Sequence, residues 1–132
     1  MITKQTVLTS DAEQPAGPYS QALKIGNQVY ISGQIGVDPA TGNLVPGGGV
    51  AEAEQVMKNL TAVLAACGCT FANVVKATIY LRDFEILYPP VNQIYERYLV
   101  QPYPVRTTIG VTHLADGASV EIDLIANLED VA

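Results

Sequence analysis

The sequence has few basic residues and no long apolar run. Seven lysines and arginines stand against thirteen aspartates and glutamates, so the formal net charge is −6. Proteins that grip nucleic acid through its phosphates need clustered Lys and Arg, so this balance argues against that class. No apolar run is long enough to span a bilayer. The first residues, MITKQTVLTSDAEQP, lack the apolar core of a signal peptide, and we expect a mature cytoplasmic protein with no membrane partner.

Cysteine and histidine are also scarce. Cys67 and Cys69 are the only cysteines, and His113 is the only histidine. One intervening residue leaves the two cysteines too close for an easy disulfide, and three such groups are too few for a zinc site. We therefore expect free thiols at the end of a helix and no metal; a redox role is possible but has no support.

The chain does have enough apolar material for one core. Its 132 residues are 48% hydrophobic and only 15% charged, which excludes disorder as the default. The length suits a single domain over residues 1–132.

The most informative segment is a strand expected over 105–112, which follows two prolines and is rich in β-branched residues. Side chains alternate across a strand, so Arg106, Thr108 and Gly110 share one face. A guanidinium on this small, neutral face leaves room for a ligand, and arginine suits a planar carboxylate. The alternative, which the residue pattern alone favours, is that Arg106 forms a salt bridge within the chain or between subunits.

Hydrophobic periodicity and turn residues predict the remaining elements. Helices are expected over 50–66 and from Pro89 or Pro90 to Leu99. A loop is expected over 38–49, and strands over 6–9, 23–25, 28–32, 73–81 and 119–128. This order favours an α+β fold with both helices on one face of a sheet. The other face is mixed rather than charged, and another copy of the chain often covers such a face.

The turn residues Asp116 and Gly117 predict a hairpin between strands 105–112 and 119–128. Position 106 would then face position 127, and position 112 would face position 121. Arg106 and Glu121 would share a sheet face about six residues, or ~20 Å, apart. One arginine side chain cannot span that gap. If Arg106 and Glu121 serve one site, we expect them to come from different subunits, unless a bulge shortens the gap.

Six segments together resemble the reactive intermediate deaminase family, also called the Rid or YjgF family. They are PAGPYSQA at 15–22, VYISGQIGVDPATG at 29–42, VVKATIYL at 74–81, VNQIYERYL at 91–99, PYPVRTTIGV at 102–111 and VEIDLIA at 120–126. The resemblance covers essentially the whole chain and implies a chorismate-mutase-like fold in a barrel-like homotrimer, with clefts between subunits. It also implies hydrolysis of 2-iminobutanoate and 2-iminopropanoate to 2-oxo acids and ammonia, with no cofactor and no metal.

The same resemblance assigns six residues to the site. Arg106 would bind the substrate carboxylate, Thr108 would help through its backbone, and Glu121 would orient the attacking water. The other pocket residues would be Tyr19, Gly33 and Asn92.

The residues alone leave alternatives for three of these positions. Tyr19 would equally well pack on the rim of the sheet. Asn92 lies off the centre of its helical stripe and could be solvated or reach a neighbouring loop. For Glu121, a surface or interface ion pair is the better interpretation.

Three functions therefore compete. The first is an imine deaminase. The second is a regulatory module that binds a small carboxylate such as a 2-oxo acid without turnover. The third is an endoribonuclease, an activity attributed to some relatives, and the acidic charge weighs against it. The expected partners are a small imino or oxo acid and further copies of the chain.

Overall fold

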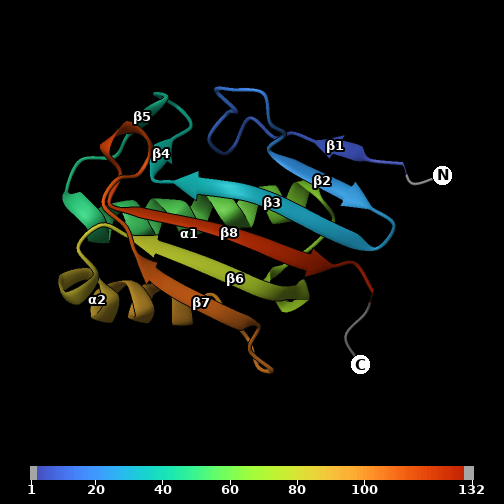
Figure 1. Cartoon of the computed structure of the whole chain (residues 1–132). Helices are drawn as coiled ribbons and strands as arrows, with labels where there is room; N and C mark the ends of the chain where they lie inside the picture. Colours follow the sequence, from blue (N-terminus) through green and yellow to red (C-terminus); the bar gives the residue numbers. More distant parts are fainter. Residues whose placement is uncertain (1–2, 130–132) are drawn as a thin grey trace.

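The computed structural model describes residues 3–129, which form a mixed six-stranded sheet, a small hairpin and two α-helices (Figure 1). The sheet has the order β1-β2-β3-β8-β6-β7, and only β6 and β7 are parallel neighbours. Its strands are β1 Gln5–Val7, β2 Ala22–Ile25, β3 Gln28–Ile35, β6 Val74–Leu81, β7 Val105–Gly110 and β8 Val120–Asn127. The other elements are β4 Val37–Asp38, β5 Asn43–Leu44, α1 Gly48–Ala66, α2 Phe84–Glu96, and the 3-10 turns η1 Phe71–Asn73 and η2 Ala115–Gly117. The expected α+β class is confirmed.

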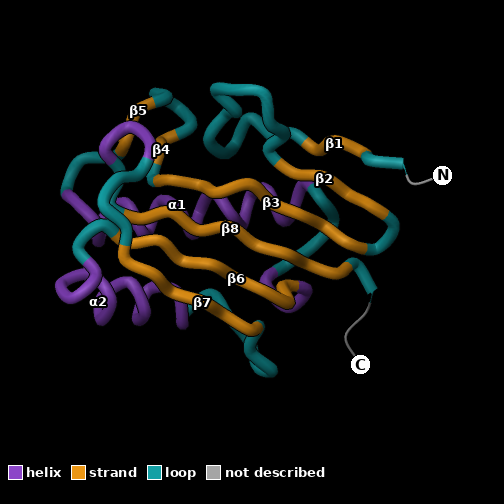
Figure 2. The backbone as a smooth tube through the Cα atoms, in the orientation of Figure 1, coloured by secondary structure: helices purple, strands orange, loops and turns teal. Residues whose placement is uncertain are grey.

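The core lies between the helices and one face of the sheet. Figure 2 shows α1 running behind the strands, where it contacts β3 and β8. Period-two alternation in β8 turns Val120, Ile122, Leu124 and Ala126 toward the helices, and each is buried. The apolar stripe expected on the first helix is buried against them: Val56, Met57, Leu60, Val63 and Leu64.

The opposite face is not covered by any helix within residues 3–129. Tyr30 and Ile109 are 42% and 41% exposed, and Val105 is 68% exposed. Polar groups lie among them, such as the Tyr80 hydroxyl, which donates a hydrogen bond to Asp123 at 2.9 Å. The face is therefore mixed, as expected. Its burial by a second copy stays a prediction.

The two cysteines lie where α1 ends. Cys67 is the C-cap of the helix, and both thiols are free, as expected. The structure also shows that both are buried. Burial raises the pKa of both thiols, and a protonated thiol is a poor nucleophile. This pair therefore contributes packing rather than reactivity.

Neither α-helix suits a bilayer. Among the described residues, no helix is long and apolar enough to cross a membrane. The cytoplasmic location expected from the amino-terminal residues stays a prediction, as does the single domain over 1–132, because residues 1–2 and 130–132 lie outside the described range.

The hairpin expected between strands 105–112 and 119–128 is wrong. β8 lies between β3 and β6, while β7 pairs with β6 at the edge of the sheet. The apolar alternation of β8 suits a central strand, whereas Pro102 and Pro104 precede β7 and suit an edge. Asp116 and Gly117 form part of η2, which connects the edge strand to the centre of the sheet.

The expected start of the second helix is also wrong, because α2 begins at Phe84 and contains both prolines. Proline lacks a backbone N–H, so Pro89 and Pro90 leave the carbonyls of Glu85 and Ile86 without their usual helical donors. Both residues are exposed, and Ile86 is 74% exposed, so water can replace the lost bonds. The helix ends at Glu96 rather than Leu99.

Two further boundaries differ near the first helix. The strand expected over 28–32 continues to Ile35, with an irregular register between Ile31 and Gln34. The loop expected over 38–49 contains the β4–β5 hairpin and the start of α1. Glycine in the left-handed region at position 47 allows the tight entry to the helix.

Asn59 connects α1 to the segment after β3. Its side chain is fully buried, and Nδ2 donates to the carbonyls of Val37 at 2.9 Å and Ile35 at 3.4 Å. Its Oδ1 accepts a hydrogen bond from Gln55 at 2.8 Å. The helix also approaches Gly36 so closely that a Cβ there would lie 2.7 Å from the helix backbone. These contacts fix the far end of β3 against the core.

Replacing Asn59 tests this connection. We expect Asn59→Ala to lower the free energy of unfolding by about 2–4 kcal/mol, because it leaves two buried carbonyls without a side-chain donor. The matched control is Lys58→Ala, an exposed position on the same helix, where a change within about 0.5 kcal/mol is expected. Urea unfolding followed by circular dichroism measures both. Equal losses in the two variants would contradict the role of Asn59.

Candidate functional site

Arg106 lies on β7 beneath α2, and the helix holds its guanidinium. Nη1 donates to Asn92 Oδ1 at 2.8 Å, and Nη2 donates to the Tyr88 hydroxyl at 3.1 Å. The guanidinium carbon lies 5.0 Å from the ring centre of Tyr95 and 5.8 Å from that of Tyr88. The parallel connection β6–α2–β7 produces this contact, because it returns the helix across the face of the strands it joins.

All of these partners are neutral. Within residues 3–129 the only ion pair joins Arg97 to Glu54. Within the described part of the chain Arg106 therefore has no salt bridge, and the intersubunit form of that alternative stays open. A guanidinium that is hydrogen-bonded but not neutralised keeps its charge for a ligand.

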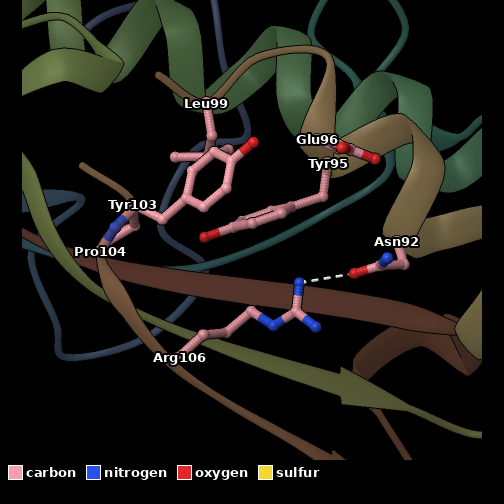
Figure 3. Close-up of a pocket in the computed structure, with 7 residues that line it drawn as sticks. All are labelled: Asn92, Tyr95, Glu96, Leu99, Tyr103, Pro104 and Arg106. Atoms are coloured by element: carbon pink, nitrogen blue, oxygen red, sulfur yellow. Dashed lines mark hydrogen bonds between the residues drawn. The ribbon is translucent and has the colours of Figure 1, made fainter. Parts of the chain in front are cut away.

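A pocket of about 330 Å³ opens beside Arg106. Figure 3 shows the guanidinium directed toward Asn92, with the Tyr95 ring alongside it and Tyr103 across the pocket. The full lining is Asn92, Tyr95, Glu96, Leu99, Tyr103, Pro104 and Arg106. The walls are mostly apolar and aromatic, with one cation, Arg106, and one carboxylate, Glu96. A largely apolar pocket with a few polar groups and a cation suits a small carboxylic acid.

Thr108 lies on the same face as Arg106, two residues further along β7. Its hydroxyl is buried and has no hydrogen-bond partner within the described residues. Its position in the sheet is set by pairing with Ile79 of β6. Arg106, Thr108 and Asn92 also line one narrow gap under α2. We call these three residues the arginine half-site.

The other three expected residues gather in a different place. Tyr19, Gly33 and Glu121 line a second pocket of about 290 Å³, and we call them the glutamate half-site. The Glu121 carboxyl lies directly over Gly33, where a Cβ would come within 2.7 Å of Glu121 Cδ. Tyr19 is 50% exposed, and its hydroxyl accepts a hydrogen bond from the backbone N–H of Ala16 at 3.2 Å. Glycine at position 33 therefore makes the space that the carboxyl occupies.

The glutamate half-site disfavours negative charge. Burial raises the pKa of Glu121, and the nearby Asp123 carboxylate raises it further. Glu13 lines the same pocket, and burial raises its pKa too, although a hydrogen bond from the Ile35 N–H acts in the opposite direction. Neither glutamate has an ion-pair partner within residues 3–129. This argues against the surface ion pair considered for Glu121 and leaves its interface form a prediction. A carboxylate with a raised pKa is a better proton acceptor.

The two half-sites lie on opposite faces of the sheet. Arg106 pairs with Ala77, and Ala77 pairs with Leu124, so all three side chains point toward the helices. Glu121 alternates with buried Val120 in β8, and so points to the uncovered face. The shared face expected for Arg106 and Glu121 is therefore wrong, together with the hairpin on which it depended.

Sequence reasoning missed three residues that lie at these pockets. Tyr88 and Tyr95 stand four residues before and three residues after Asn92, which places all three on one helix face. That spacing is the available signal in the sequence, but it is equally typical of an apolar stripe that faces the core. No sequence pattern indicates Glu13, because it comes close to Glu121 only through the fold of the loop in which it lies.

Comparison with known proteins finds relatives that match nearly the whole chain. The family model described as Endoribonuclease L-PSP matches residues 9–128. The 2-iminobutanoate/2-iminopropanoate deaminase of Mus musculus is 46% identical over 125 residues, which cover 95% of this chain and 92% of the mouse protein. The human protein of the same name is 42% identical over 125 residues, with 95% of this chain and 90% of that protein covered.

Solved structures agree with these relatives. RidA from the Antarctic bacterium Psychrobacter sp. PAMC 21119 superposes with a TM-score of 0.88 at 41% identity, covering 93% of this chain and 98% of that one. Escherichia coli TdcF with bound serine superposes with a TM-score of 0.86 at 28% identity, again covering 93% and 98%. Because the family model matches residues 9–128 and the two named relatives are 46% and 42% identical over 95% of the chain, this chain belongs to the Rid/YjgF/L-PSP family.

Proposed function

We propose that this protein hydrolyses 2-iminobutanoate and 2-iminopropanoate to the corresponding 2-oxo acids and ammonia. The observation that carries the proposal is the guanidinium of Arg106, which is held by neutral partners beside a pocket of about 330 Å³. The named activity of relatives that align with 95% of the chain supports it. The bound serine of TdcF adds support, because serine also carries nitrogen next to a carboxylate-bearing carbon.

For this reaction the protein mainly has to bind the imino acid and orient it. Arg106 holds the substrate carboxylate through charge-assisted hydrogen bonds, each contributing about 1.5–3 kcal/mol. A backbone carbonyl near Gly33 or Thr108 accepts a hydrogen bond from the imine N–H. These contacts leave the electrophilic carbon facing the attacking water.

Glu121 completes the hydrolysis. Its carboxylate accepts a proton as the water oxygen bonds to the imine carbon, and the C=N pair of electrons goes to nitrogen. Glu121 delivers this proton to nitrogen, which gives a carbinolamine. It then transfers the proton of the new hydroxyl to nitrogen in the same way, so that the C=O bond forms, the C–N bond breaks and ammonia leaves with both water protons. Such general acid–base assistance is worth about 10²–10⁴-fold in rate.

A complete site needs more than one copy of the chain. The arginine half-site and the glutamate half-site lie on opposite faces of one sheet, so neither can serve the other within a chain. We therefore place each site between adjacent subunits of a chorismate-mutase-like homotrimer, whose barrel buries the uncovered sheet faces. The exposed Val105 and Ile109 on edge strand β7 support burial by another copy.

Two alternative functions can be compared with the proposed deaminase activity. A carboxylate-binding module would use the same arginine half-site without turnover. Endoribonuclease action is named in the matched family model, but only seven basic residues and a net charge of −6 oppose a phosphate-binding surface.

Turnover depends on Arg106 under this proposal. We expect Arg106→Ala to lower kcat/KM by at least about tenfold, because the carboxylate loses its charged donor. The assay couples excess threonine dehydratase to the protein and follows the acceleration of 2-oxobutanoate release. The control is Arg97→Ala, whose side chain is 62% exposed and pairs with Glu54 on the surface; it should behave as wild type. A wild-type protein that binds 2-oxobutanoate but gives no acceleration would be a binding module.

Mixed trimers test whether the site is shared. In a trimer that combines Arg106→Ala and Glu121→Ala chains, one of the three clefts receives both intact residues if each cleft takes them from neighbouring copies. Trimers carrying both variants, isolated with two affinity tags, should therefore recover about one third of wild-type activity. Each homotrimer of a single variant serves as the control. No recovery in the mixed trimers would place both residues in one chain's site.

The pH dependence tests Glu121 as the proton acceptor. Because the pKa of Glu121 is raised, kcat/KM should fall on acidification through a value above the ordinary 4.5. Asp123→Asn removes a neighbouring negative charge but keeps an acceptor for the Tyr80 hydroxyl, so this acid limb should move to lower pH. Glu85→Gln, an exposed charge on α2, should leave the limb in place. An unmoved limb in Asp123→Asn would argue against Glu121.

A further inference from the structure

One face of α2 presents three side chains to a single guanidinium. Tyr88 and Asn92 each accept one hydrogen bond from Arg106, and the ring of Tyr95 lies 5.0 Å from the guanidinium carbon. The spacing of four and then three residues keeps these side chains in one row along the helix. Tyr95 is 6% exposed, while Tyr88 is 36% exposed at the outer end of the row.

Asn92 and Tyr95 do not neutralise the guanidinium of Arg106. Asparagine does not titrate, and burial raises the pKa of Tyr95 although Arg106 acts to lower it. Attraction between a guanidinium and an aromatic face orients the cation without cancelling its charge. A carboxylate in the same place would cancel that charge and compete with any acidic substrate.

The hydrogen bonds leave one edge of the guanidinium available. Arginine has five N–H groups in one plane. Tyr88 and Asn92 take one hydrogen from each terminal nitrogen, which leaves one hydrogen on each of them and the hydrogen on Nε. A planar carboxylate can bind two of these remaining donors at once.

We propose that Tyr88 and Tyr95 are positioning residues that act through Arg106, Tyr88 by its hydroxyl and Tyr95 by its ring, and hold the guanidinium edge-on to the substrate carboxylate. This inference rests on the function proposed above. It assigns different atoms to the two tyrosines, because the Tyr95 hydroxyl has no hydrogen-bond partner within the described residues and does not touch Arg106 through a hydrogen bond.

The difference between the two tyrosines defines the experiment. In Tyr88→Phe the ring remains and the acceptor is lost, so the affinity for pyruvate should weaken three- to tenfold. In Tyr95→Leu the ring is lost, and the affinity should weaken tenfold or more. Tyr95→Phe keeps the ring and should recover most of that loss. Titration calorimetry with pyruvate measures binding, and the coupled dehydratase assay measures kcat and KM.

A positioning role has a kinetic signature. KM for the imine should rise in Tyr88→Phe and Tyr95→Leu in proportion to the lost pyruvate affinity, while kcat stays within twofold. Tyr98→Phe is the matched control, since Tyr98 packs on Phe71 away from Arg106; it should match wild type in both assays. Thermal unfolding of each variant identifies any that fail to fold, and Tyr88→Phe, at a partly exposed position, decides the question if Tyr95→Leu does not.

The outcomes separate this inference from the proposed function. If the wild-type protein binds pyruvate without turnover and the variants bind it more weakly, the positioning role is supported and the deaminase function is excluded. If the wild-type protein turns over the imine and the variants keep its affinity for pyruvate, the positioning role alone is excluded. Tyr95→Phe as weak as Tyr95→Leu overturns the assignment to the ring, and no pyruvate binding by wild type overturns the positioning role itself.

Discussion

The contact between the Arg106 guanidinium and α2 is the constraint on which the arrangement of the site depends. β6 and β7 are parallel neighbours, so the helix between them must cross their face. The arginine at the edge of the sheet therefore meets a helix rather than water. Neutral side chains on that helix orient the cation, while the absence of an acidic partner among the described residues preserves its charge. Because β7 is an edge strand, the Arg106 guanidinium is held by α2 on one side and faces the pocket on the other.

The sheet separates the two kinds of chemistry. Charge for binding an acid lies on the helical face, and a carboxyl with a raised pKa lies on the other. Separation keeps Glu121 from neutralising Arg106 within one chain. Assembly would then bring together two groups that each subunit keeps apart, so that chemistry and quaternary structure depend on each other.

Much of this could be predicted from local patterns. Helical spacing located α1, and alternation placed Arg106 and Thr108 on one face, since both signals depend only on near neighbours. The place of β8 between β3 and β6 could not be predicted in this way, because hairpin signals describe strands adjacent in sequence. The start of α2 was missed because proline normally marks a helix end, and here exposure offsets its cost. For the site, the family resemblance indicated six residues but not Tyr88, Tyr95 or Glu13, and only the structure divides the six between two faces of the sheet.

The position of β8 also bears on how the protein is made. Within residues 3–129, the strand at the centre of the sheet, β8, follows every other strand in sequence, and it joins β3 to β6. During synthesis the antiparallel strands β1, β2 and β3 and the β6–α2–β7 unit emerge first. Each has an open hydrogen-bonding edge and an incomplete core. They can join only after residues 120–127 have left the ribosome. Folding of the sheet can therefore be completed only after its other five strands have already been synthesised.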